Sequence, residues 1–264
     1  MKLTIGCTTR PHSAWSFAKA CEYIAAAGYT DVAVFSNEGN TLVRADSTAG
    51  EIAATRKAAA DAGIAPSMVI GGTKLGLGLD AAVDDYKKLI DNVAEVGAKW
   101  LLDCGTGREQ ADIYFELMRR AAVHAEKSGV GITLKPHDGI TLTIDDLIDA
   151  YEKVNQPAFG ICYDPGNIIY YTKGELRPEP DIARVAPTVT TGIIKDCVVN
   201  DGVPDVMVTP GEGLVDFEKV LGGLVEGGFR GPLYVECVAG KELDEINKNV
   251  KSTLKFISGI LAKL

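Results

Sequence analysis

Polar and charged side chains stand where several apolar runs of this sequence end. In chain order, the clearest examples are Lys135, His137, Asp164, Asn167, Lys195 and Glu236. Carboxylates, imidazoles and ammonium groups are the side chains that move protons and stabilise developing charge in active sites. They also form structural ion pairs when they are buried. Chemistry between these residues requires a fold that brings the ends of the apolar runs together.

Each candidate also has a purely structural interpretation. Lys135 would pair with Asp164 or Glu236 inside a barrel that catalyses nothing. Asp164 precedes a Pro-Gly pair and would form a turn. His137 would be a ligand, a substrate contact or a hydrogen-bonded core group. Glu236 is the hardest to explain structurally, because it ends the apolar run PLYV, where a charge is usually paired or functional.

The elements that must position these residues follow a repeated pattern. A helix-like stretch has a glycine near its end, and a short β-branched run follows, as at 24–28 before 31–35 and at 94–97 before 99–103. Glycine after a helix adopts positive φ and satisfies the last carbonyl groups. Runs such as WLLDC and FGICYD are apolar on both faces, which is typical of parallel strands covered on both sides.

Eight such runs are present, and their starts are spaced by about 30 residues, the length of one βα unit. The predicted strands span 3–7, 31–35, 67–70, 99–103, 130–135, 158–164, 190–196 and 232–237. The sequence therefore predicts an α/β fold, a (β/α)8 TIM barrel that forms a single domain over 1–264. A doubly wound sheet is the alternative, but the segment after the first run, GCTTRPHSAW, lacks its phosphate-binding glycine pattern. We also expect Thr143 to cap a helix, and a final helix over 241–264.

Composition excludes several function classes. The chain has 264 residues, 46% of them hydrophobic, and a formal net charge of −9, so it is not disordered. No basic run is present, and we expect no nucleic-acid partner. No stretch approaches the ~20 apolar residues that span a bilayer, and the first residues lack an apolar signal block, so we expect a cytoplasmic protein without a membrane partner. The six scattered cysteines are then expected to be buried thiols.

Five motifs in order carry a more specific resemblance. They are LKPHDG at 134–139, YDPGN at 163–167, IIKD at 193–196, PGEGLVDF at 210–217 and YVEC at 234–237. This set resembles the sugar phosphate isomerase/epimerase family of the xylose isomerase-like TIM barrel superfamily, over essentially the whole chain. The resemblance implies an enzyme of carbohydrate metabolism with a small carbohydrate substrate and, as in many relatives, a homo-oligomer.

The resemblance also implies a divalent metal, but the residues depart from the family's ligand set. The family holds its metal through Glu, Asp, His and Glu on strands five to eight. Asp164 and Glu236 match two of these positions, whereas Lys135 and Ile193 occupy the other two. Two carboxylates make only a weak Mn or Mg site. We therefore expect no cofactor or a weakly bound metal at Asp164 and Glu236, with the ammonium group of Lys135 in its place.

The activity that the resemblance implies is an isomerase or epimerase reaction on a sugar, sugar phosphate or sugar acid, by proton transfer next to a carbonyl. Glu236 would be the base, and Lys135, His137 or Lys195 would stabilise the oxyanion or return the proton. Schiff-base chemistry at Lys135 ranks lower, because neighbouring carboxylates oppose the depressed pKa that it needs. The substrate-binding candidates are His12, Asp164, Asn167, Lys195 and Glu212. A dehydratase-type lyase acting on a keto-sugar or inosose and a non-catalytic sugar-binding barrel are the alternatives.

Overall fold

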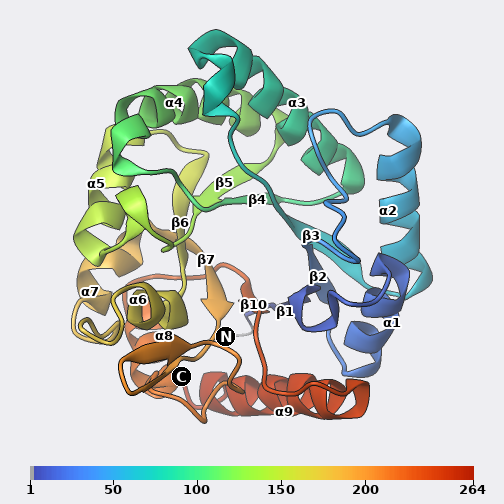
Figure 1. Cartoon of the computed structure of the whole chain (residues 1–264), viewed down its shortest axis with the longest axis vertical. Helices are drawn as coiled ribbons and strands as arrows, with labels where there is room; N and C mark the ends of the chain where they lie inside the picture. Colours follow the sequence, from blue (N-terminus) through green and yellow to red (C-terminus); the bar gives the residue numbers. More distant parts are fainter. Residues whose placement is uncertain (1–2) are drawn as a thin grey trace.

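The strands close into a parallel barrel in which spatial neighbours follow the chain order (Figure 1). The computed structural model describes residues 3–264. Within that range the eight barrel strands are β1 (Ile5–Thr8), β2 (Asp31–Val34), β3 (Ala65–Ile70), β4 (Trp100–Asp103), β5 (Gly131–Leu134), β6 (Phe159–Tyr163), β7 (Val189–Ile194) and β10 (Leu233–Val235). β1 pairs with both β2 and β10, which completes the ring. The predicted (β/α)8 barrel is confirmed, and each predicted run contains one of these strands or overlaps it.

Helices surround the barrel, as Figure 1 shows. They are α1 (Phe17–Ala26), α2 (Ala49–Asp61), α3 (Leu79–Val96), α4 (Ala111–Ser128), α5 (Ile144–Val154), α6 (Pro165–Tyr171), α7 (Ile182–Val185), α8 (Phe217–Glu226) and α9 (Leu243–Leu261). Short 3-10 turns are η1 (Arg10–His12), η2 (Leu75–Leu77), η3 (Arg108–Gln110), η4 (Gly139–Thr141) and η5 (Ala186–Thr188). The predicted final helix is confirmed as α9. Within residues 3–264, no helix has both the length and the apolar character that crossing a membrane requires.

Local signals in the sequence explain where the helices begin and end. The Thr143 hydroxyl accepts a hydrogen bond from the Asp146 amide at 3.1 Å, and the Asp146 carboxylate accepts one from the Thr143 amide at 2.9 Å, so α5 begins with a capping box. Gly97 follows α3 with φ of 98° and Gly129 follows α4 with φ of 67°. A residue with a side chain is strained at such angles, which is why glycine ends these helices.

The core has two layers because successive strand residues face opposite sides of the sheet. The larger layer lies between strands and helices. The smaller layer fills the inside of the barrel and consists of Ala33, Phe35, Met68, Leu102, Cys162, Ile193 and Tyr234. The expected buried thiols are confirmed: five of the six free cysteines are buried, and Cys104 is partly exposed. The inside of the barrel therefore contains an apolar layer below the carboxyl ends of the strands.

One buried carboxylate organises the long connection from β7 to α8. This connection contains an antiparallel hairpin, β8 (Val198–Asn200) and β9 (Val203–Asp205), that the sequence analysis does not predict. Asp196 is fully buried and accepts four backbone hydrogen bonds of 2.8–3.0 Å, from the amides of Cys197, Gly211, Gly213 and Val215. Asp196 therefore fixes the loop, while the adjacent Lys195 points to other partners.

We expect Asp196→Ala to lower the free energy of unfolding by more than about 3 kcal/mol, because several buried amide donors would lose their acceptor. Asp205→Ala is the matched control in the same loop, since the exposed Asp205 carboxylate accepts only the Met207 amide within the described chain. That variant should lose less than about 1 kcal/mol. Urea unfolding of both variants measures the difference, and equal losses would contradict the role given to Asp196.

Candidate active site

Four charged residues directly follow four neighbouring strands and face the inside of the barrel. Lys135 follows β5, Asp164 follows β6, Lys195 follows β7 and Glu236 follows β10. The residues two positions earlier on β6, β7 and β10 belong to the interior apolar layer. The period of two therefore places these charges in the next inward layer, at the carboxyl end of the barrel. The structure thus brings four of the sequence-predicted residues together, and we call them the charged layer.

Positive and negative groups alternate within the charged layer. Lys135 Nζ lies 2.7 Å from Glu236 Oε2 and 3.4 Å from Asp164 Oδ2. Lys195 Nζ lies 2.6 Å from Glu236 Oε1 and 3.1 Å from Asp164 Oδ2. The lysine side chains are 3% and 1% exposed, and both carboxylates are fully buried. Each carboxylate therefore contacts two ammonium groups almost out of reach of solvent.

A fifth charge, which the sequence analysis does not include among the site residues, joins from β1. Arg10 begins η1, two residues after β1, and its Nη1 donates to Glu236 Oε1 at 3.0 Å. Its side chain is 46% exposed, so it covers Glu236 from the solvent side. The signal was present in the sequence, because Arg10 follows the first apolar run just as the other charges follow theirs.

The environment keeps both signs of charge ionised. Burial alone would raise the pKa of Glu236, but the nearby Lys135, Lys195 and Arg10 outweigh that effect and hold the pKa well below its usual range. Burial alone would lower the pKa of Lys135, but the carboxylates of Glu236 and Asp164 outweigh it and raise the pKa well above its usual range. Glu236 is therefore a weak base, and Lys135 remains an ammonium group that cannot attack a carbonyl.

His137 lies beside the charged layer on the segment after β5. The imidazole is half-buried, and its Nε2 lies 2.6 Å from the Tyr171 hydroxyl oxygen. Burial lowers the pKa of His137, and the positive charges of Lys135 and Lys195 lower it further, so the ring is neutral at neutral pH. Tyr171, at the end of α6, is a site residue that the sequence analysis does not find.

Asn167, another predicted residue, also contacts the charged layer. Asp164 caps α6 by accepting a hydrogen bond from the Asn167 amide at 3.0 Å, so its turn-forming role and its place in the charged layer coexist. The Asn167 side chain donates to the Pro136 carbonyl at 2.7 Å and accepts from Lys195 Nζ at 3.0 Å. Asn167 thereby links the segments after β5, β6 and β7.

Two predicted substrate contacts lie apart from the charged layer. His12 is fully buried, its Nε2 lies 2.8 Å from Asn247 Oδ1 on α9, and its ring packs beside Trp15 and Tyr23. Glu212 is exposed on the loop that Asp196 organises, and its carboxylate has no hydrogen-bond partner within residues 3–264. The structure thus gives His12 a packing role and places Glu212 on the surface.

Two neighbouring hollows open at the same end of the barrel, and His137 lines one of them. One, of about 610 Å³, is lined by 104–109 and by His137, Asp138 and Gly139. The other, of about 380 Å³, is lined by the glycine-rich segment 71–76, by 103–106 and by Gln110. Cys104 lines both hollows, and Lys135 and Glu236 lie close enough to influence its charge. The glycine-rich segment 71–76 is therefore positioned at this opening.

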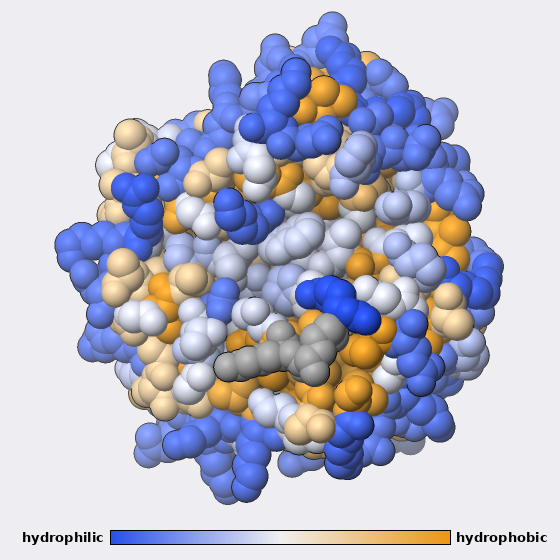
Figure 2. Space-filling view, turned by 180° about the vertical axis from the view of Figure 1, so that it is seen from behind, coloured by the Kyte–Doolittle hydropathy of each residue, from blue (hydrophilic) through white to orange (hydrophobic). Residues whose placement is uncertain are grey.

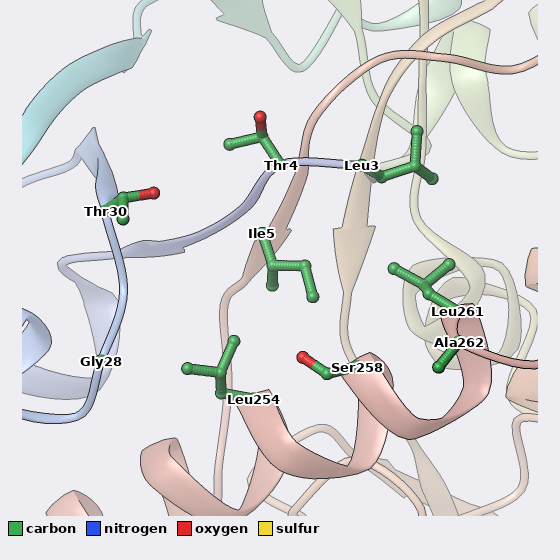
Figure 3. A pocket seen from close by; sticks show the side chains of 9 residues that line it. All are labelled: Leu3, Thr4, Ile5, Gly28, Thr30, Leu254, Ser258, Leu261 and Ala262. Atoms are coloured by element: carbon green, nitrogen blue, oxygen red, sulfur yellow. The ribbon is translucent and has the colours of Figure 1, made fainter. Parts of the chain in front are cut away.

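A cavity of about 590 Å³ lies at the opposite end of the barrel, next to the start of β1 (Figure 3). Its walls include Leu3, Ile5, Leu254 and Leu261 and contain no charged side chain among the described residues. Figure 2 shows this back face of the molecule, on which hydrophobic side chains gather below the centre. The charged layer and His137 are therefore at the other end of the barrel.

The residues of the charged layer do not fit a resident divalent metal. Mg²⁺ and Mn²⁺ prefer several oxygen ligands. Within the described chain, no cluster of three or more His, Cys, Asp or Glu side chains is arranged to hold an ion. Asp164 and Glu236 already contact two ammonium groups each, which would repel a cation. Ile193, at the family's histidine position, belongs to the interior apolar layer and offers no donor.

Comparisons with known proteins agree with the architecture. The family model described as "Xylose isomerase-like TIM barrel" matches residues 21–259. A search of curated proteins finds no match. Among solved structures, a xylose isomerase domain protein from Planctomyces limnophilus is 23% identical, with a TM-score of 0.72 and 92% of each chain covered.

Two further structures are similar in fold at lower identity. A xylose isomerase-like TIM barrel protein from Mycobacterium smegmatis, in complex with magnesium, is 17% identical with a TM-score of 0.78, and 98% of each chain is covered. D-Psicose 3-epimerase from Clostridium cellulolyticum H10, with D-tagatose, is 14% identical with a TM-score of 0.79, covering 98% of this chain and 99% of that one. At these identities the likeness extends to the fold alone.

We expect Glu236→Gln to destabilise the protein by about 3 kcal/mol at neutral pH, because two buried ammonium groups would retain only Asp164 as a carboxylate partner. The lowered pKa of Glu236 means that its carboxylate stabilises the fold above about pH 4.5, its ordinary value, and that this stabilisation is lost as the pH falls further.

Urea unfolding between neutral pH and about pH 3 measures this effect. Stability should fall less steeply below about pH 4.5 in Glu236→Gln than in the wild type. Glu116→Gln is the matched control, because Glu116 pairs with Arg119 at 2.9 Å on the surface of α4. An unchanged acid slope in Glu236→Gln would show that the ionised carboxylate does not support the fold.

Proposed function

Because the chain belongs to the xylose isomerase-like TIM barrel family, we propose that it is a sugar isomerase or epimerase that moves a proton next to a carbonyl without a bound metal. The observation that carries the proposal is the position of the Lys135 and Lys195 ammonium groups between Asp164 and Glu236. The carbohydrate class is supported by the similarity to structures named as sugar epimerases, among them the one with D-tagatose.

Removal of a proton from the carbon next to a carbonyl leaves negative charge on the carbonyl oxygen. A fixed positive group near that oxygen lowers the barrier most when it needs no rearrangement. Lys135 and Lys195 meet that requirement, because contacts with Asp164 and Glu236 hold their ammonium groups in place. In this proposal the two lysines stabilise the oxyanion, and Lys195 also contacts the substrate as the sequence predicts.

The proton acceptor that the geometry favours is His137 rather than Glu236. The low pKa of Glu236 makes it a weak base, whereas His137 is neutral, half-buried and adjacent to the hollow lined by 104–109. The Tyr171 hydroxyl oxygen, 2.6 Å from Nε2, would accept a hydrogen bond from the Nε2 proton, so that Nδ1 keeps its lone pair and takes the substrate proton. Glu236 would then act as a positioning residue that holds Lys135 and Lys195.

A non-catalytic barrel remains the second candidate, and one observation favours it. The lysine side chains are only 3% and 1% exposed, as expected for a structural ion network. Catalysis then requires a substrate oxygen to reach ammonium groups that the surrounding residues almost completely cover. A dehydratase-type lyase shares the first proton transfer and differs in its product, which has lost water.

Deuterium incorporation tests the proposed reaction directly. We expect turnover of at least one member of a ketose panel that includes D-tagatose and D-allulose, in D2O with EDTA, and the product should carry deuterium at the carbon next to the carbonyl. Lys135→Met should lower kcat by about 100-fold, because one group that stabilises the oxyanion is lost. Lys153→Met on the surface of α5 is the control, since Lys153 pairs only with exposed Asp149 among the described carboxylates.

Three outcomes would contradict this function. No turnover of any sugar favours the non-catalytic barrel. A product that has lost water favours the lyase. Activity that EDTA abolishes and Mn²⁺ restores would show that the reaction depends on a metal.

The pH dependence distinguishes the two candidate bases. With His137 as the base, kcat/KM should fall as the pH drops below about 6.5, because protonation removes the acceptor and the pKa of this histidine is lowered from that value. His137→Gln should lose this acid limb and about 100-fold or more in kcat/KM. A wild-type profile that stays flat down to about pH 4.5 would instead support Glu236, whose pKa lies below that value.

A further inference from the structure

Among the groups that form ion pairs with one another at the charged layer, positive charges outnumber negative ones. Arg10, Lys135 and Lys195 face only two carboxylates, Asp164 and Glu236, within the described chain. The excess of one positive charge is local, because the whole chain has a formal net charge of −9. A buried or half-buried excess charge favours a ligand of opposite sign, since the interior screens it poorly.

The other titratable groups near the charged layer do not cancel this excess. Burial raises the pKa of Cys104 and of Cys237 to about 11, so both thiols are neutral. Burial raises the pKa of the Tyr171 hydroxyl to about 12, so it is also neutral. His137 is uncharged at neutral pH because burial and the two lysines lower its pKa. None of these groups supplies a negative charge. Two further buried carboxylates lie at this end of the barrel, but neither pairs with the three cations within the described chain: Asp103 accepts hydrogen bonds from Tyr86, Tyr114 and the Gly105 amide, and Asp196 accepts four from backbone amides.

Arg10 is the cation that a ligand can reach. Its side chain is 46% exposed, whereas the two lysines are 3% and 1% exposed. Only Nη1 of its guanidinium has a hydrogen-bond partner within residues 3–264, namely Glu236 Oε1. The remaining N–H donors of the planar group are available to a ligand, and their fork matches the oxygens of a carboxylate or a phosphate.

We infer that Arg10 binds an anionic group of the substrate, so that this site takes a sugar that carries a carboxylate or a phosphate ester rather than a neutral sugar. The inference rests on the proposed function, because it names the substrate class of the same site. Arg10 would bind the anionic group of the substrate at the solvent-exposed edge of the charged layer, while the substrate carbonyl approaches Lys135 and His137. A neutral sugar would leave the positive excess uncompensated.

Binding of small anions tests the inference without requiring the true substrate. Calorimetry at low ionic strength, with inorganic phosphate and with glycolate as probes, should detect one site per chain for at least one of them. Binding should weaken as salt is added, because the site is partly exposed. Arg10→Met should weaken binding about tenfold or more, and Arg10→Lys should retain part of it, because it keeps the charge but loses the fork.

Arg119→Met is the matched control, because Arg119 is 41% exposed and pairs with a glutamate on the outer helix α4. This variant should bind the probes like the wild type. D-Glucose, D-glucuronate and D-glucose 6-phosphate then compare a neutral, a carboxylate and a phosphate group on one ring, and the tighter anionic sugar identifies the source of the charge. Failure of both probes to bind the wild type, or equal binding by Arg10→Met, would overturn the inference.

The two proposals fail separately. Arg10-dependent anion binding without turnover of any sugar would leave this inference standing and would remove the isomerase. Turnover of a neutral ketose by a protein that binds neither phosphate nor glycolate would support the isomerase and remove the anionic substrate.

Discussion

A single ammonium group or carboxylate buried inside a closed barrel would be costly to fold, and the alternating contacts among Lys135, Asp164, Lys195 and Glu236 offset most of that cost. The arrangement depends on strand periodicity, which turns the residue after each of four strands inward, and on the apolar floor beneath them. It also determines the chemistry. Both carboxylates lie beside ammonium groups that would repel a metal cation, and the raised pKa of Lys135 keeps this lysine charged.

In the proposed reaction, each of the neighbouring charged and polar groups has a different role. Lys135 and Lys195 carry positive charge in fixed positions, Glu236 holds them, and Arg10 presents the remaining positive charge to the solvent. His137 stays neutral beside them, with Tyr171 on its Nε2. In our proposal an anionic sugar binds Arg10, and its carbonyl is activated by the lysines while the imidazole moves the proton.

The sequence predicts the barrel well because its signals are local: runs apolar on both faces, glycines such as Gly97 after helices, and the Thr143 cap. The strand-end rule also finds the charged layer and Asn167. It gives no side-chain direction outside the strands, so it does not reveal that His12 packs toward α9. Tyr171 was missed because only the path of α6 brings it to His137. The β8–β9 hairpin has a signal in the sequence, Asn-Asp-Gly at 200–202, which favours a tight turn between antiparallel strands rather than a parallel βα unit.

The Lys135 and Lys195 ammonium groups lie between Asp164 and Glu236, in the place that a divalent ion bound by these two carboxylates would take. A titration of metal-stripped protein with Mn²⁺, followed by the electron paramagnetic resonance signal of the free ion, tests this arrangement most directly. The account predicts that free Mn²⁺ rises in proportion to the amount added from the first addition. Disappearance of one equivalent of Mn²⁺ per chain from the free signal, with uptake lost in Glu236→Gln, would contradict it and would place a metal in the charged layer.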